Sequence, residues 1–297
     1  MFLNIRKLQD KSWSFWIKVA LAIVLLLPIF IGVVLFIRSL IVLEAVGIHD
    51  LLLTSSWRPT RGEFGFLPFI VSSIWVTVLG VIITAPICLF SALYLTQYGS
   101  ARLLRFMQPV IDILAGIPSV IYGVWGVLVI VPLVRDYIMP LFGVQGTGFS
   151  ILAGGIVVAV MLIPFVVNIL IEVLRTVPVE LTEASLSLGA NKWQTVKLVV
   201  LRRAFPGIVA AFGLGLSRAF GETIAVLMVV GNVLAMPNGV FDPGYPLPAL
   251  IANNYGEMMS IPMYDSALMF AALILLVVVM MSNFLSRSLI VILEKRI

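Results

Sequence analysis

Residues 176–201 read T-V-P-V-E-L-T-E-A-S-L-S-L-G-A-N-K-W-Q-T-V-K-L-V-V-L and form the one large polar element between long hydrophobic runs. Pro178 suits the first turn of a helix, where its missing N–H costs nothing. Gly189 suits a helix end, because glycine adopts the left-handed conformation without steric cost. A second short helix is expected over residues 192–201. The stretch therefore predicts a helix, a glycine turn and a second helix that leads into a membrane span.

The first of these helices is amphipathic by its spacing. One face carries Leu181, Ala184, Ser185 and Leu188, and an adjoining polar face carries Glu180, Glu183 and Ser187. Such a helix between membrane spans is typical of a docking element for a partner protein. An ordinary amphipathic surface helix with a glycine cap is the alternative.

The composition assigns the chain to the membrane proteins. Hydrophobic residues make up 61% of the 297 residues, against roughly 45–50% in a soluble globular protein. The formal charge of +5 is spread over short loops, which argues against a nucleic-acid partner. Cys88 is the only cysteine and His49 the only histidine, so no metal site is predicted within the chain.

Six apolar runs are long enough to cross a bilayer, so the predicted fold class is an all-α membrane protein with six transmembrane helices. The runs cover residues 17–37, 69–95, 109–134, 149–174, 205–232 and 266–290. The first is longer than the apolar core of a signal peptide and is expected to be an uncleaved span. The predicted division of the chain is an N-terminal region (1–68), a transmembrane core (69–290) that contains a cytoplasmic loop at 175–204, and a tail (291–297).

The distribution of lysine and arginine predicts the orientation, because cytoplasmic loops carry the excess. Fourteen basic residues belong to the N-terminus, the 96–107 loop, the 175–204 loop and the C-terminal end, and four belong to the opposite loops. Both termini are therefore expected in the cytoplasm. The loop at 233–264 is expected to face outward.

Arg218 and Glu222 lie within the fifth apolar run, where charged side chains are costly and usually face a cavity or a partner. Four residues separate them, so on one helix they would share a face and could form a salt bridge. One interpretation is a neutral pair that fixes helix packing. The other is an arginine that lines an anion pathway, since its planar guanidinium donates two hydrogen bonds to phosphate at once.

The sequence shows no motif for catalysis or for ATP binding. It has no G-x-x-x-x-G-K-[ST] phosphate-binding loop and no nucleophile–base pairing, so no catalytic residue is predicted. Uphill movement of a solute would need energy from a partner or from an ion gradient.

The loop resembles the "EAA" loop of binding-protein-dependent ABC importer permeases, E-A-A-x3-G-x9-I-x-L-P. Glu183, Ala184 and Ser185 stand for E-A-A, and Gly189 stands for the glycine. Val199 and Leu201 stand for I-x-L. Arg202 replaces the final proline, which puts the local bend in doubt.

Three further stretches are similar to the C-subunit branch of the phosphate-specific ABC transporter permeases. They are L-A-G-I-P-S-V-I-Y-G-V-W-G (114–126), I-P-F-V-V-N-I-L-I-E-V-L-R-T-V-P (163–178) and S-R-A-F-G-E-T-I-A-V-L-M-V-V-G-N (217–232). The resemblance implies a type I ABC importer fold in a bacterial or archaeal cytoplasmic membrane. It implies a channel-forming permease that is not an enzyme and holds no cofactor, because ATP is bound by the partners.

The implied partners are two ATP-binding subunits, a homologous A-type permease, an external phosphate-binding protein and membrane lipid. The residues implied in coupling to the ATPases are Glu180, Glu183, Ala184, Ser185, Leu188 and Gly189, and those implied in phosphate passage are Arg218 and Glu222. A permease for another tetrahedral anion, molybdate or sulfate, is the nearest alternative. An ion-coupled secondary transporter is the alternative from a different class.

Overall fold

A computed structural model describes residues 2–256 and 261–294, and the side chains of residues 13–256 and 261–292. Residues 257–260 of the expected outer loop and 295–297 of the expected tail lie outside the described residues. The N-terminal elements are α1 (Phe2–Val46), α2 (Ile48–Leu53), β1 (Trp57–Arg58), β2 (Glu63–Phe64) and α3 (Leu67–Leu93). The middle of the chain forms α4 (Ala101–Gly116), α5 (Ser119–Trp125), α6 (Val131–Leu133), α7 (Met139–Leu141) and α8 (Ile151–Arg175). The remaining helices are α9 (Val179–Ser187), α10 (Lys192–Thr195), α11 (Leu201–Phe220), α12 (Ile224–Val229), α13 (Leu247–Asn254) and α14 (Pro262–Glu294).

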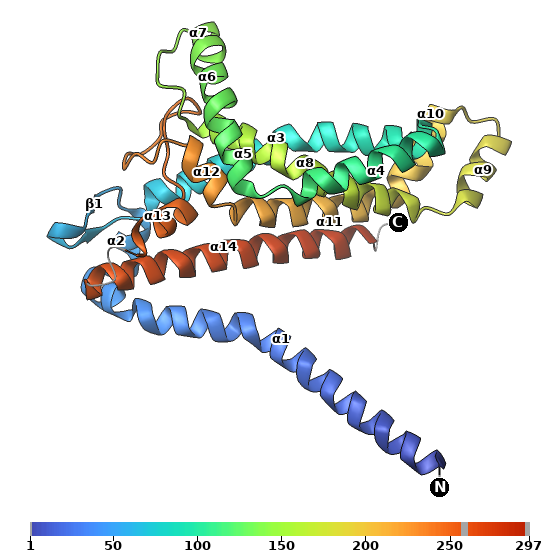
Figure 1. Cartoon of the computed structure of the whole chain (residues 1–297), viewed down its shortest axis with the longest axis horizontal. Helices are drawn as coiled ribbons and strands as arrows, with labels where there is room; N and C mark the ends of the chain where they lie inside the picture. The colour runs from blue at the N-terminus through green and yellow to red at the C-terminus, as the bar shows by residue number, and fades with distance from the viewer. Residues whose placement is uncertain (1, 257–260, 295–297) are drawn as a thin grey trace.

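Six helical segments of the described chain are long and apolar enough to cross a membrane, which confirms the predicted number of spans. They are Trp13–Val46, Leu67–Tyr98, Ser119–Leu141, Ile151–Arg175, Lys192–Phe220 and Pro262–Ile292. Helices α3, α8, α11 and α14 run side by side, with α9 at one end of the bundle and β1 and α13 at the other (Figure 1). The first turns of α1 and the last turns of α14 point toward the end that carries α9 (Figure 1).

Close packing of small residues joins α3 to α8 at the centre of the bundle. A Cβ atom added to Gly80 would lie 2.8 Å from Val158 Cγ1, and one added to Gly155 would lie 2.8 Å from Leu79 Cβ. Both contacts are too short for any side chain, so the two helices approach each other at glycines. A Cβ atom added to Gly123, Gly126, Gly213 or Gly215 would also lie closer than 3.0 Å to a side chain, whereas one added to Gly154 would make an ordinary 3.4 Å contact and one added to Gly116 would meet nothing within 4 Å.

The third span, Ser119–Leu141, begins later than the predicted run of about 109–134, in which Gly116, Pro118 and Pro132 were expected to interrupt the helix. The backbone leaves the helical conformation at Ile117 and Pro118, and α4 ends before this break while the segment 119–141 begins after it. Proline lacks an N–H and pushes the residue before it into the extended region, which ends a helix. The segment 119–141 then turns away from the axis of α8 (Figure 1).

The fifth span also differs from the prediction of about 205–232. Helix is continuous from Lys192 to Phe220 through α10, a π-helical turn at 196–200 and α11, so Arg202 lies inside a helix rather than at a bend. Helix α11 ends at Phe220, and the short α12 begins only at Ile224. The last third of the predicted span is therefore a break followed by a separate helix.

The first span extends further than its apolar run, because α1 continues to Val46 and includes residues 38–46 that were expected in a loop. Val42 explains this extension. It is fully buried, and its N–H is 3.1 Å from Ser266 Oγ on α14. Contact with α14 therefore holds this end of α1 helical beyond the apolar residues.

Candidate functional site

Helix α9 confirms that a short helix lies between Pro178 and Gly189. Pro178 takes the position just before the first helical residue, with an extended backbone, rather than the first turn. Gly189 has φ 85°, the left-handed conformation predicted for it. Helix α9 buries none of its residues in this chain. Leu188 is 89% exposed and Leu181 is 43% exposed, so the predicted apolar face is uncovered.

The chain holds α9 through its connection to α10. Ser185 Oγ lies 3.0 Å from Thr195 Oγ1, so the third residue of the E-A-A match fixes the helix to the segment that follows it. Asn191 and Gln194 form a reciprocal capping box, each with a 2.9 Å bond between its side chain and the backbone N–H of the other. These contacts give the docking helix a defined direction while leaving its outer face free in this chain.

Grooves open on both sides of α9. One of about 540 Å³ is lined by Glu180 and Leu181, together with Arg202 and Arg203. The other, of about 390 Å³, is lined by Thr182, Glu183 and residues of the second, fourth and fifth spans. The structure thus places Glu180 and Glu183 on different flanks of the same exposed helix.

The predicted salt bridge between Arg218 and Glu222 is absent, and the prediction was wrong for a clear reason. Helix α11 ends at Phe220, so the two residues do not share a helix and their four-residue spacing places them on no common face. Glu222 Oε1 instead accepts a 3.1 Å hydrogen bond from the Ala225 N–H in the first turn of α12. Across the described side chains, Arg218 forms no ion pair.

Arg218 is held by an aromatic ring instead. Its guanidinium carbon lies 4.5 Å from the centre of the Phe165 ring. Phe165 lies near the middle of α8, so Arg218 lies at the depth of the middle of that span. The arginine is exposed on the surface of this chain. A cation over an aromatic face is oriented without being neutralised, so Arg218 keeps its hydrogen-bond donors for another group.

A row of polar side chains runs along α8 from Arg218 toward the docking loop. Asn168 Nδ2 donates a 2.8 Å hydrogen bond to Asp112 Oδ1 on α4. One turn further, Arg175 pairs with Glu172 at 3.2 Å and lies 3.5 Å from Gln108 Oε1 on α4. Asp112, Glu172 and Arg175 are all exposed in this chain. Phe165, Asn168, Glu172 and Arg175 are spaced three or four residues apart, so they share one helix face. We call Asn168, Glu172 and Arg175, together with Gln108 and Asp112 of α4, the polar seam.

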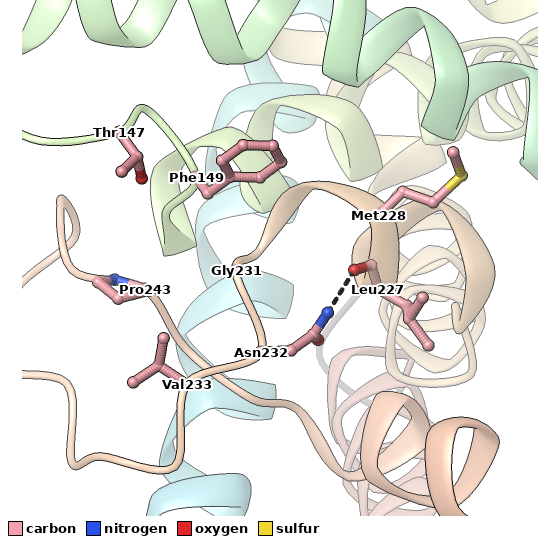
Figure 2. A pocket seen from close by; sticks show the side chains of 8 residues that line it. All are labelled: Thr147, Phe149, Leu227, Met228, Gly231, Asn232, Val233 and Pro243. Carbon is pink, nitrogen blue, oxygen red and sulfur yellow. Dashed lines mark hydrogen bonds between the residues drawn. The ribbon is translucent and has the colours of Figure 1, made fainter.

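A pocket of about 440 Å³ lies on the other side of the break, next to α12. Asn232, at the end of the third quoted stretch, has the unusual φ of 53°, and its amide donates a 2.7 Å hydrogen bond to the Leu227 carbonyl (Figure 2). The pocket is lined by Thr147, Phe149, Leu227, Met228, Gly231, Asn232, Val233 and Pro243 (Figure 2). The Arg218 region is thus followed by a hollow at the end of the molecule away from α9.

Sequence reasoning identified Arg218 and the residues of α9 but missed Phe165 and Asn168. Both lie in the quoted stretch 163–178, yet neither carries a charge that would single it out. The contact of Asn168 with Asp112 joins α8 to α4, and that of Phe165 with Arg218 joins α8 to α11, so only the packing of these helices could reveal them. Glu172 and Arg175 are three residues apart on one helix, so their pairing has a signal in the sequence.

Residues 85–297 match the family described as "Binding-protein-dependent transport system inner membrane component". A probable ABC transporter permease protein of Bacillus subtilis is 38% identical over 230 residues, which are 77% of this chain and 73% of the relative. The phosphate transport system permease protein PstC of Xylella fastidiosa is 36% identical, over 76% and 73% of the two chains. The probable phosphate transport system permease protein PstC of Methanocaldococcus jannaschii is 32% identical, over 95% and 94%.

Solved structures share the architecture. An inward-facing structure of the MetNI methionine ABC transporter matches with a TM-score of 0.59 and 22% identity, over 80% of this chain and 99% of the matched chain. A second crystal form of that transporter matches with a TM-score of 0.55 and 23% identity, over 77% and 94%. At this level of identity the match shows the fold, that of the permease chain of a type I ABC importer.

Proposed function

The chain belongs to the family of binding-protein-dependent transport system inner membrane components, and we propose that it is the channel-forming subunit of an ATP-driven importer of inorganic phosphate. The permeases named for phosphate transport among its relatives support this substrate. The family match over residues 85–297 includes the two stretches that carry Phe165, Arg218 and Asn232.

Arg218 is the observation that carries the proposal. It is a cation at the depth of the middle of α8, exposed in this chain, and oriented by Phe165 without an ion pair to another described residue. A doubly ionised oxyanion that passes along this surface meets a guanidinium with free donors. The polar seam leads from that point to the docking loop, and its carboxylates Asp112 and Glu172 are occupied by Asn168 and Arg175. The seam is therefore suited to one wall of a hydrated pathway, with a second permease as the other wall.

Helix α9 is the proposed contact with the ATP-binding subunits. Its outer face is uncovered, and Ser185 and the capping box of α10 hold it at a fixed angle to the fifth span. Movement of α9 would pass directly to Arg218, because helix is continuous from Lys192 to Phe220. Closure of the ATPase pair would draw the docking helices together and open the pathway outward, and ATP hydrolysis would reset it. The energy then comes from the partners, and this chain needs no ATP site.

The remaining partners follow from the same proposal. A homologous A-type permease would complete the pathway, and an external phosphate-binding protein would deliver the substrate at the end that carries α13 and the pocket beside Asn232. No match favours the ion-coupled secondary transporter. Sulfate and molybdate have the same tetrahedral shape as phosphate. An uptake assay has to distinguish these three anions as substrates.

Substrate competition tests the proposal. The assembled transporter in proteoliposomes, with its binding protein outside and ATP inside, should accumulate radiolabelled phosphate. A tenfold excess of unlabelled phosphate should abolish the signal, and the same excess of sulfate or molybdate should leave most of it. Competition by sulfate or molybdate as strong as that by phosphate would refute phosphate as the substrate.

A further inference from the structure

A groove separates α1 from the start of α14 at the end of the molecule away from α9. Its volume is about 320 Å³, and it is lined by Val34, Ile37, Arg38, Ile41, Pro262 and Asp265. The two helices are joined beside it by the contact of Val42 with Ser266. From that contact they diverge toward the N-terminus (Figure 1). The groove therefore lies along the outer edge of the helix pair rather than in the bundle.

One cationic and one anionic side chain line the groove, and the distance between them is long for an ion pair. Arg38 Nη1 and Asp265 Oδ2 are 3.7 Å apart, too far for a strong hydrogen bond. The Arg38 side chain is 64% exposed and that of Asp265 is 16% exposed. Asp265 Oδ1 is buried without a hydrogen-bond partner among the described residues. Oδ2 is thus the Asp265 oxygen that remains available to a ligand, and the Arg38 guanidinium, which also lines the groove, makes no hydrogen bond to a described residue.

The two charges lie at the level of the lipid head groups. Arg38 directly follows the apolar run 17–37, and Asp265 lies in the first turn of α14, directly before the apolar stretch of that span. Both therefore mark the same boundary of the hydrocarbon region. The rest of the groove is apolar: Val34, Ile37 and Ile41 are 39%, 59% and 54% exposed and have no cover from this chain.

We propose that this groove binds one phospholipid whose head group combines a phosphodiester with a primary ammonium, as in phosphatidylethanolamine. The phosphodiester would receive hydrogen bonds from Arg38, and the ammonium would donate to Asp265 Oδ2. An acyl chain would cover Ile37 and Val34 toward the membrane centre. Choline head groups lack N–H donors, so the same site would hold phosphatidylcholine through its phosphate alone. The inference is independent of the transported substrate.

Free phosphate has the same chemistry as the lipid phosphodiester, but the apolar lining favours the lipid. An inorganic anion gains nothing from Val34, Ile37 and Ile41, whereas each buried methylene of an acyl chain contributes about 0.8 kcal/mol. A surface ion pair with no ligand is the remaining interpretation, and such pairs contribute little to stability. The experiment separates all three.

The test is native mass spectrometry of the assembled transporter taken from nanodiscs that contain equal amounts of phosphatidylethanolamine and phosphatidylcholine. The wild type should retain one phosphatidylethanolamine in preference to phosphatidylcholine by about tenfold, the effect of one charge-assisted hydrogen bond. Asp265→Asn should remove the preference, and Arg38→Gln should remove the retained lipid. Arg38→Lys should keep part of it, because the point charge remains.

Two further variants serve as controls for this test. Arg61→Gln removes an exposed arginine at the same end of the molecule and should change nothing. Ile41→Trp fills the groove with both charges intact and should expel the lipid, while co-purification of the partner subunits reports correct assembly. Equal retention of the two lipids by the wild type, or unchanged retention in Arg38→Gln, would refute the lipid site. Displacement of the retained lipid by millimolar inorganic phosphate would assign the site to the free anion and would also refute it.

Discussion

At the scale of single residues, the central finding is that Arg218 is oriented by an aromatic ring and not by Glu222. A glutamate partner would neutralise the arginine and hold its donors, whereas the Phe165 ring leaves both its charge and its hydrogen-bonding edge available. The Glu222 carboxylate instead accepts a hydrogen bond from a backbone N–H in the first turn of α12. The break between α11 and α12 therefore separates the Arg218 guanidinium from the Glu222 carboxylate.

Phe165→Leu tests this arrangement. Loss of the ring should leave Arg218 less well ordered and raise the phosphate concentration for half-maximal uptake by up to about tenfold, within the range of a cation–π contact. Phe165→Tyr keeps the ring and should transport like the wild type. Unchanged uptake in the leucine variant, with normal assembly, would show that the contact does not position Arg218.

Gly189 supports a second residue-scale prediction. Its φ of 85° is costly for any residue with a Cβ atom, and an added Cβ meets nothing within 4 Å, so only the backbone conformation opposes a substitution. Gly189→Ala should cost about 1 kcal/mol locally and lower the rate of phosphate-stimulated ATP hydrolysis, while Gly189→Asn, which tolerates this conformation, should preserve more of it. Equal rates for the two variants would contradict the role of the turn.

At the scale of elements, α9 is a helix with an uncovered outer face on a fixed connection. Glu183→Lys reverses a charge on that face, and we expect it to abolish the ATP hydrolysis that phosphate-loaded binding protein stimulates. Asp50→Lys makes the same change of charge on an exposed side chain at the other end of the molecule and should have no effect. Intact stimulation in Glu183→Lys would show that α9 does not couple this chain to the ATPases.

The elements also show what the sequence could predict. Helices α8 and α9 and the turn at Gly189 follow from apolar length, proline and glycine, which act locally. The break at Ile117–Pro118 had a visible signal in the proline. The break after Phe220 had only Gly221, and glycine is common inside membrane helices, so the run seemed continuous and the Arg218–Glu222 pair was misplaced. The contacts of Phe165 and Asn168 arise from packing between helices and left no periodic signal.

At the scale of the whole molecule, the glycine contacts between α3 and α8 hold the bundle together. Gly155→Ala would place a Cβ atom 2.8 Å from Leu79 Cβ, and overpacking of this kind costs roughly 1–3 kcal/mol. We expect a lower midpoint of thermal unfolding for the purified complex. Gly116→Ala adds the same methyl group where nothing lies within 4 Å and serves as the control. A midpoint for Gly155→Ala equal to that of Gly116→Ala would contradict the close packing.

Three features follow one another in the molecule: the uncovered helix α9, the unbroken helix from Lys192 to Phe220, and Arg218, which forms no ion pair with any described side chain. We propose that Arg218 attracts phosphate into a pathway. The polar seam and the pocket beside Asn232 would extend this pathway in opposite directions from Arg218.

Phosphate uptake in cells that carry Arg218→Gln tests this claim most directly, with co-purification of the ATP-binding subunits as the measure of assembly. We expect uptake to be lost while assembly stays normal, because glutamine keeps the polar character but not the charge or the paired donors of the guanidinium. Uptake equal to that of the wild type would contradict the account and reduce Arg218 and Phe165 to a packing contact.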